Sequence, residues 1–175
     1  MNPAASREPF EFSISRVLDA PRELVWKAWT EPERLMRWFS PKGFTNISSR
    51  LDLRVGGTYH YGLRMPDGGE MWGRFIYREI VPPERLVHIV HFSDPEGGVT
   101  RHPMNAEWPL KILSTITLEA QGDKTLLTVH WVPFEATDEE IRAFEGGKES
   151  MKAGWGGTID QLEAYLAEAV GEKGR

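Results

Sequence analysis

The longest amphipathic pattern in the chain lies near its C-terminus, in residues 148–170. Apolar side chains recur there at steps of three and four, which places them on one face of an α-helix, while charged side chains fall elsewhere. These apolar positions are Met151, Trp155, Ile159, Leu162, Leu166 and Val170. At ~1.5 Å per residue such a helix would be roughly 35 Å long, about the width of a small domain. Its apolar face therefore needs a partner surface of similar length.

Three glycines surround Trp155 inside this helical pattern, at positions 154, 156 and 157. A glycine within a helix costs about 1 kcal/mol relative to alanine, so some gain should offset it. Two interpretations stay open. Either the helix backbone packs closely against a sheet, or the glycines leave room beside the indole ring for a bound molecule.

The rest of the chain is dominated by the period of β-strands. Residues 10–18 alternate apolar and polar side chains, and strand-like runs return between residues 44 and 134. The later runs cover residues 47–55, 58–65, 70–81, 85–92, 110–120 and 125–134. Both faces of 85–92 carry apolar residues, so the pattern leaves its register open. We expect six or seven antiparallel strands.

Short helices are expected on either side of these strands. Asp19 and Thr30 are candidate caps for two helices after the first strand, because a proline follows each of them in the opening turn. Residues 137–140 have the spacing of a capping box that opens a further helix. Gly146 and Gly147 are expected to break or kink that helix before residue 148.

The connection over residues 93–109 is long, polar and contains glycine and proline. Loops of this length are usually functional or disordered, and we interpret this one as a candidate lid. With 175 residues and 40% hydrophobic content, the chain is long enough for one core. We expect one domain over residues 9–171, with flexible ends at 1–8 and 172–175.

Charge and composition exclude several classes of function. The formal net charge is −5 and the basic residues are scattered, which argues against nucleic acid as a partner. The chain has no cysteine, so disulfides, thiolate metal sites and cysteine nucleophiles are excluded. No apolar run approaches the ~20 residues of a membrane span, and the N-terminus lacks the pattern of a signal peptide. We therefore expect a cytoplasmic protein.

The order of elements and several local motifs resemble one known family. Residues 16–38, RVLDAPRELVWKAWTEPERLMRW, are similar to the opening signature of homologues of the activator of the heat-shock-protein-ninety ATPase. This family is a branch of the SRPBCC superfamily, which includes the START and Bet v-type proteins. Further similar motifs are residues 56–59, 79–86, 114–118, 125–129, and Gly154-Trp155 with Leu162. The resemblance covers nearly the whole chain.

The resemblance implies an α+β helix-grip fold, in which a curved antiparallel sheet wraps around the C-terminal helix and two short helices follow the first strand. It also implies a mostly apolar cavity between sheet and helix, whose contents in the superfamily range from lipids and plant metabolites to polyketides that some members cyclise. Many relatives are expected to have a histidine where this chain has Trp131, so no polar ligand contact is carried over there. Co-chaperone activity belongs to eukaryotic members with a further N-terminal domain, and the branch name does not define a function.

Residues that could catalyse a reaction are few. The five histidines, at positions 60, 88, 91, 102 and 130, lack the spacing of a metal site. No nucleophile elbow or phosphate-binding glycine loop is present. We assign no catalytic residue, no metal and no cofactor, although a histidine in the cavity could act as a general base.

Aromatic and aliphatic side chains are the better candidates for a site. The cavity-lining candidates are Trp38, Phe39, Leu51, Leu53, Tyr59, Tyr61, Ile116, Val129, Trp131, Met151, Trp155, Ile159 and Leu162. The same residues could instead fill a solid core that needs no ligand. Our leading hypothesis is a binding protein for a small hydrophobic or aromatic molecule. The alternatives are a cyclase or hydrolase with a cavity histidine, and an interaction module that contacts a chaperone or forms a homodimer.

Overall fold

The computed structural model describes residues 11–173. In chain order the elements are β1 (Phe12–Leu18), α2 (Arg22–Thr30), α3 (Pro32–Trp38), β2 (Thr45–Leu51), β3 (Thr58–Arg64), β4 (Glu70–Val81), β5 (Arg85–Ser93), β6 (Val99–Thr100), β7 (Ile112–Gln121), β8 (Lys124–Pro133), α4 (Asp138–Gly146) and α5 (Lys148–Lys173). The flexible ends were predicted at 1–8 and 172–175, and residues 1–8 and 174–175 lie outside the described residues. Helix α5 continues through Lys173, past the predicted boundary at 171.

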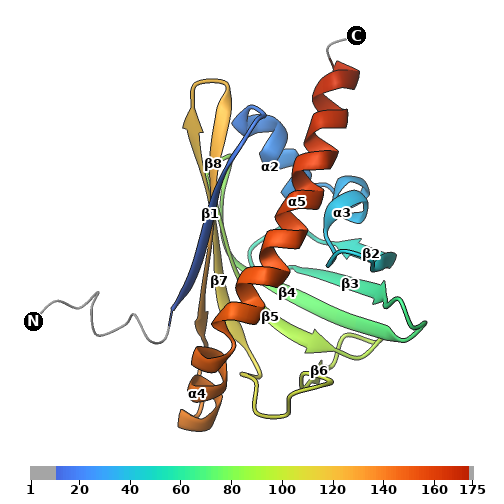
Figure 1. Cartoon of the computed structure of the whole chain (residues 1–175), viewed down its shortest axis with the longest axis vertical. Helices are drawn as coiled ribbons and strands as arrows, with labels where there is room; N and C mark the ends of the chain where they lie inside the picture. The colour runs from blue at the N-terminus through green and yellow to red at the C-terminus, as the bar shows by residue number, and fades with distance from the viewer. Residues whose placement is uncertain (1–10, 174–175) are drawn as a thin grey trace, which may run out of the picture.

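One antiparallel sheet holds all eight strands, in the order β1-β8-β7-β5-β4-β3-β2 with β6 paired to β5. The sheet curves around α5, while α2 and α3 lie near one end of that helix and α4 lies at the other (Figure 1). This is the expected α+β helix-grip arrangement. The expectation of six or seven strands missed β6, because two residues are too short to show a strand period. Among the described residues, no helix is long and apolar enough to cross a membrane.

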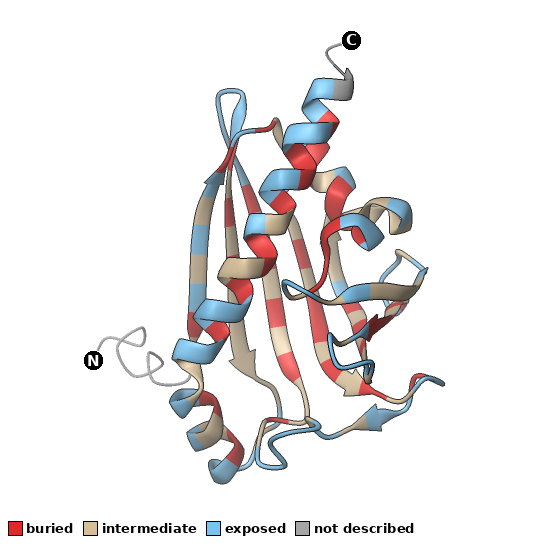
Figure 2. Ribbon diagram, turned by 45° about the vertical axis from the view of Figure 1, so that its right-hand side comes forward, coloured by how far each residue is buried: buried red, intermediate tan, exposed pale blue. Residues whose placement is uncertain are grey.

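Helix α5 buries the face that its periodicity predicted (Figure 2). Met151, Trp155 and Ile159 are all buried, and so are Leu162 and Leu166. Val170 was predicted to continue this face, but its side chain is 40% exposed, so that prediction is wrong. Because 3.6 residues make one turn, position 169 returns to the direction of Met151 and position 170 is rotated away. The small Ala169 takes the buried place instead.

The strand register places Ile116 and Val129 on the inner face of the sheet and settles the register of 85–92, which the sequence left open. Ile116 and Val129 pair across β7 and β8, and both are buried. On β5, Leu86 lies opposite Ile116 and Val90 lies opposite Ile112, so the even-numbered side chains of β5 face α5. The other face of β5 is also covered, because Ile89 is only 4% exposed. This double burial explains why 85–92 showed no alternation.

The helix caps agree with the sequence at one helix and differ at two. Thr137 and Glu140 form the predicted capping box at α4. Asp19 and Thr30 were predicted as caps, but the N-cap residues of α2 and α3 are Pro21 and Glu31, with no side-chain cap hydrogen bond. The Thr30 hydroxyl instead donates to the Trp26 carbonyl at 2.7 Å, because Thr30 is still inside α2.

The loop over residues 93–109, predicted as a lid, is attached to α4 by a buried carboxylate. Glu140 is 6% exposed and accepts hydrogen bonds from the Arg101 guanidinium and from the backbone N–H of Leu110. Burial opposes its ionisation, but the Thr137 N–H and Arg101 donors outweigh burial and lower the pKa of Glu140. Gly147 then ends α4, and a Cβ there would lie 2.7 Å from the Trp108 ring. Whether this loop opens stays a prediction.

Replacing Glu140 by alanine should lower the free energy of unfolding by about 1–2 kcal/mol, because it removes the capping box and the acceptor shared by Arg101 and Leu110. Glu139→Ala is the matched control, since Glu139 is an exposed acid in the same first turn. Urea unfolding of the two variants and the wild type measures the difference. Equal losses in both variants would show that the buried carboxylate is not what secures this loop.

Candidate functional site

A hollow in two connected parts lies between the concave face of the sheet and α5. One part, which we call the loop pocket, has a volume of about 340 Å³, and the other, the aromatic groove, about 330 Å³. The loop pocket lies beside the 93–109 loop, and the aromatic groove extends along α5 from Met151 to Thr158. Residues that line both parts are Tyr61, Val90, Phe92, His102, Trp131 and Met151.

Five of the residues predicted from the sequence line the aromatic groove. They are Phe39, Tyr61, Trp131, Met151 and Trp155. The Trp155 ring meets Trp131 edge-on at 5.7 Å and stacks on Trp29 at 6.2 Å, measured between ring centroids. The side chains of β8, α5 and α2 therefore form one continuous aromatic wall.

The other eight predicted residues lie outside the lining of either part. They are Trp38, Leu51, Leu53, Tyr59, Ile116, Val129, Ile159 and Leu162, and they are packed in the core or against it. The space between sheet and α5 is closed there by α2 and α3, where Trp29 and Trp38 meet at 4.8 Å. The interior is thus solid at one end of α5 and hollow at the other.

Gly73 on β4, which the sequence analysis did not single out, shapes the groove. A Cβ atom at Gly73 would lie 2.2 Å from the Tyr61 hydroxyl oxygen, so the Tyr61 ring lies flat across this glycine. Glycine inside a strand often marks such a close approach, and this was the available signal. The arrangement keeps the bulky ring against the sheet and out of the groove.

The glycines of α5 do not serve close packing. A Cβ atom at Gly154 or Gly156 would meet nothing within 4 Å, and one at Gly157 would meet only the Lys42 Cβ, at 3.9 Å. Close packing against the sheet is therefore the wrong interpretation. Gly154 lines the groove beside Trp155, which fits the second interpretation.

A short polar row crosses the concave face. Tyr77, His88, Ser114 and Trp131 lie directly opposite one another on β4, β5, β7 and β8. The Trp131 indole N–H donates to the Ser114 hydroxyl oxygen at 3.0 Å. The sequence analysis placed Ser114 only in a motif similar to the family, and it counted His88 only as one of five histidines. The signal that could have identified His88 from the sequence is a polar residue on an otherwise apolar inner face.

His88 is buried and neutral. It is 1% exposed, and its ring stacks on Phe75 at 4.0 Å. Its Nδ1 atom has no hydrogen-bond partner within residues 11–173. Burial lowers the pKa of His88 to about 3, so the ring carries no charge at neutral pH.

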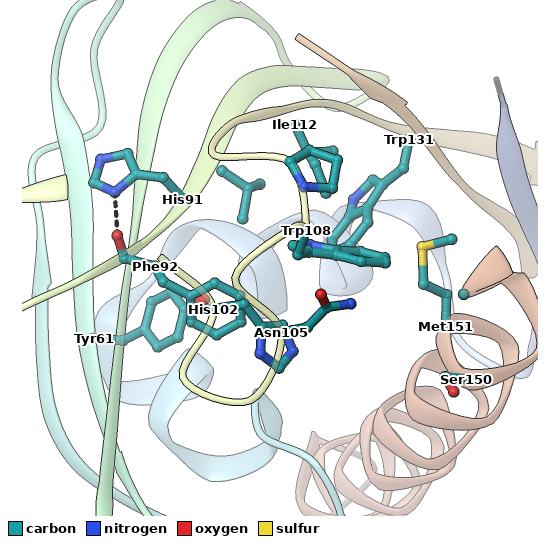
Figure 3. Close-up of a pocket in the computed structure, with 13 residues that line it drawn as sticks. Tyr61, His91, Phe92, His102, Asn105, Trp108, Ile112, Trp131, Ser150 and Met151 are labelled. Carbon is teal, nitrogen blue, oxygen red and sulfur yellow. Dashed lines mark hydrogen bonds between the residues drawn. The ribbon is translucent and has the colours of Figure 1, made fainter. Parts of the chain in front are cut away.

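The loop pocket, shown in Figure 3, is lined by a larger share of polar surface than the groove. Trp108, Asn105 and His102 reach it from the loop, and Met151 faces Trp131 from α5. Burial lowers the pKa of His102, so this imidazole is also biased toward the neutral form. No Asp or Glu side chain of the described residues lines this pocket or the groove. Residues 11–173 also contain no cluster of three or more His, Asp or Glu side chains that could hold a metal.

Comparisons with known proteins agree with this architecture. A crystal structure of a protein from Nitrosomonas europaea is 26% identical and has a TM-score of 0.73, with 93% of this chain and 97% of that chain covered. A solution structure of a protein from Arthrobacter aurescens is 29% identical with a TM-score of 0.73, covering 92% and 88% of the two chains. An AHSA1-like protein from Aeromonas hydrophila shares the fold at 20% identity and a TM-score of 0.66, covering 91% and 93%. A search of curated proteins gives no significant match.

The fold of these neighbours is the helix grip of the SRPBCC superfamily, which supports a module of the ligand-binding type in general terms. The model of one protein family matches residues 19–167 of the 175. The chain therefore belongs to the family described as Activator of Hsp90 ATPase homolog 1-like protein.

Proposed function

We propose that the protein binds a small hydrophobic or aromatic molecule in the hollow between its sheet and α5. The observation that carries this proposal is the aromatic groove of about 330 Å³, which is lined without any Lys, Arg, Asp or Glu side chain of the described residues. Its volume falls within the range of small-molecule sites, about 300–1,000 Å³. The groove exposes apolar surface to water, and an apolar ligand that covers this surface would gain the free energy of burying it.

Methionines make the groove adaptable. Four of the six methionines of the chain line it, at positions 65, 71, 104 and 151. Methionine side chains are flexible and polarizable, and they make favourable contacts with aromatic rings. Together with the walls at Phe39, Tyr61 and Trp155, they suit a flat, apolar ligand whose outline can vary.

A titration with the neutral fluorophore N-phenyl-1-naphthylamine tests the proposal, because its emission rises in apolar surroundings and Trp155 would report its arrival. Replacing Gly154 by leucine should weaken binding at least about 10-fold, since a side chain there fills part of the groove. Gly156→Leu is the matched control. Both glycines lie in α5 with open space at their Cβ position, but Gly156 does not line the groove.

Both variants should fold at least as well as the wild type, because leucine has the higher helix propensity. A wild type that leaves the fluorophore unbound would refute the proposal. Equal binding by the two leucine variants would place the bound fluorophore somewhere other than the groove.

The enzyme alternative has candidate residues but weaker chemistry. His88, His91 and His102 line the hollow, yet no carboxylate of the described residues lines it to orient any of them. The lowered pKa of His88 makes it a weak base near pH 7. Binding without reaction is therefore better supported. Contact with a chaperone and formation of a homodimer stay predictions.

A further inference from the structure

Two polar side chains interrupt the apolar wall of the aromatic groove. His88 on β5 and Ser114 on β7 are directly opposite each other in the antiparallel register, and both line the groove. Side chains in this relation have Cβ atoms about 5 Å apart on the same face of the sheet. Both side chains are almost fully covered, with His88 1% and Ser114 0% exposed, so a ligand group that enters this part of the groove wall to contact one of them also meets the other.

Both groups have hydrogen-bonding capacity that the described residues do not use. The Ser114 oxygen accepts from the Trp131 indole, which leaves its own O–H free to donate. The neutral His88 ring has one donor and one acceptor nitrogen, and Nδ1 is buried without a partner in the described part of the chain. Buried polar atoms in native proteins are nearly always paired, so the unpaired Nδ1 atom of His88 needs an explanation.

Stability does not explain the histidine. Its ring stacks on Phe75 and meets Tyr77 edge-on, and an apolar side chain in this place would make similar contacts without an unsatisfied nitrogen. A residue that weakens the fold at a cavity wall is the expected mark of a binding group.

The surroundings also restrict the charge of the ligand. The groove presents no charged side chain of the described residues, and an ionised group is strongly disfavoured in such a space without a counter-charge. The carboxylate of a fatty acid would therefore have no partner. A neutral oxygen would find both a donor and an acceptor.

We propose that His88 and Ser114 recognise a single neutral hydroxyl group on an aromatic ligand, as in a phenol. The ligand O–H donates to the unprotonated nitrogen of His88, and the ligand oxygen accepts from the Ser114 O–H. The aromatic body lies between Trp155 and Tyr61. This proposal rests on the proposed function and narrows it to neutral, hydroxylated aromatic molecules.

Three probes with the same ring system test it, namely 2-naphthol, 2-methylnaphthalene and 2-naphthoate. Each is titrated into the 175-residue chain while tryptophan emission is followed. His88→Phe should weaken 2-naphthol about 10-fold and change 2-methylnaphthalene less than about 2-fold, because only the hydroxyl loses a hydrogen bond. 2-Naphthoate should bind more weakly than 2-naphthol to the wild type.

Two further variants separate recognition from folding. His130→Phe is the matched control, because His130 is a partly buried histidine of the same sheet that lines neither part of the hollow, and it should leave both affinities unchanged. His88→Gln keeps a donor and an acceptor, and it should restore part of the affinity for 2-naphthol. If His88→Phe does not fold, the comparison of His88→Gln with Ser114→Ala carries the test, and Ser114→Ala should lose the preference for 2-naphthol.

The outcomes distinguish this proposal from the more general one. Equal effects of His88→Phe on 2-naphthol and 2-methylnaphthalene, or tighter binding of 2-naphthoate, would overturn the hydroxyl proposal and leave groove binding intact. If N-phenyl-1-naphthylamine binds and none of the three probes does, the hydroxyl proposal is likewise overturned and groove binding is left intact. Failure of N-phenyl-1-naphthylamine as well would overturn the proposed function itself.

Discussion

Lowering the pH from 7 to 5 should reduce the free energy of unfolding by about 2 kcal/mol through His88 alone. The pKa of this buried imidazole is about 3 in the folded protein, whereas its ordinary value is 6.5. The folded state therefore keeps the ring neutral, while the unfolded chain takes up a proton below pH 6.5. The stability is fully present above that value and is lost progressively as the pH falls toward 3. Across the whole window the loss reaches about 5 kcal/mol.

Urea unfolding at pH 7, 6 and 5 measures this effect in the wild type and in His88→Phe. Burial also lowers the pKa values of His91 and His102, so these two residues act in the same direction in both proteins. The pKa of Glu140 is lowered from its ordinary value of 4.5, so this carboxylate titrates below the measured range of pH 7 to 5. The wild type and His88→Phe should therefore differ in how steeply the free energy of unfolding changes with pH, and this difference isolates the contribution of His88. If the free energy of unfolding changes equally with pH in both proteins, the His88 ring is hydrated or hydrogen-bonded in solution.

Much of the fold could be predicted because its patterns are local. The spacing of Met151, Trp155 and Ile159 is set within one helix, and the Thr137–Glu140 capping box within one turn. The alternation in β7 and β8 needs only neighbouring residues. The N-caps of α2 and α3 were missed because Asp19 and Thr30 have the stronger intrinsic preference for that position, whereas the helices begin after Pro21 and Glu31.

The candidate site could be predicted only in part, because it depends on pairings between distant segments. His88, Ser114 and Trp131 become neighbours through the order β5-β7-β8 and through one particular register, which a single sequence does not specify. A shift of one residue would turn His88 to the other face.

Residue type alone also could not show which aromatic residues line the groove and which fill the solid core. Trp38 and Trp155 are both buried aromatic residues that were predicted to line a cavity. Trp38 donates its indole N–H to the Ala28 carbonyl at 3.0 Å and joins α2 to α3, while Trp155 faces the groove. The difference arises from where the short helices end along α5, which is a matter of tertiary packing and not of residue type.

Trp155→Ala should lower the free energy of unfolding by about 3–5 kcal/mol, the range measured for buried aromatic residues in other proteins. The ring contacts Trp29, Phe39 and Trp131, so its loss separates α5 from α2 and from β8. Thermal or urea unfolding measures the loss. Trp26→Ala is the control, because Trp26 is only partly buried against the same core and should cost less.

Added indole should partly reverse this loss. Trp155→Ala extends the existing hollow by the volume of one indole ring, and a molecule that binds only the folded state raises its stability with concentration. Indole should therefore raise the melting temperature of Trp155→Ala more than that of Trp26→Ala, whose missing ring leaves no enclosed space. A larger rise of the melting temperature in Trp26→Ala would show that the Trp155 ring does not separate groove from core. A loss of less than about 1 kcal/mol in the free energy of unfolding of Trp155→Ala would show the same.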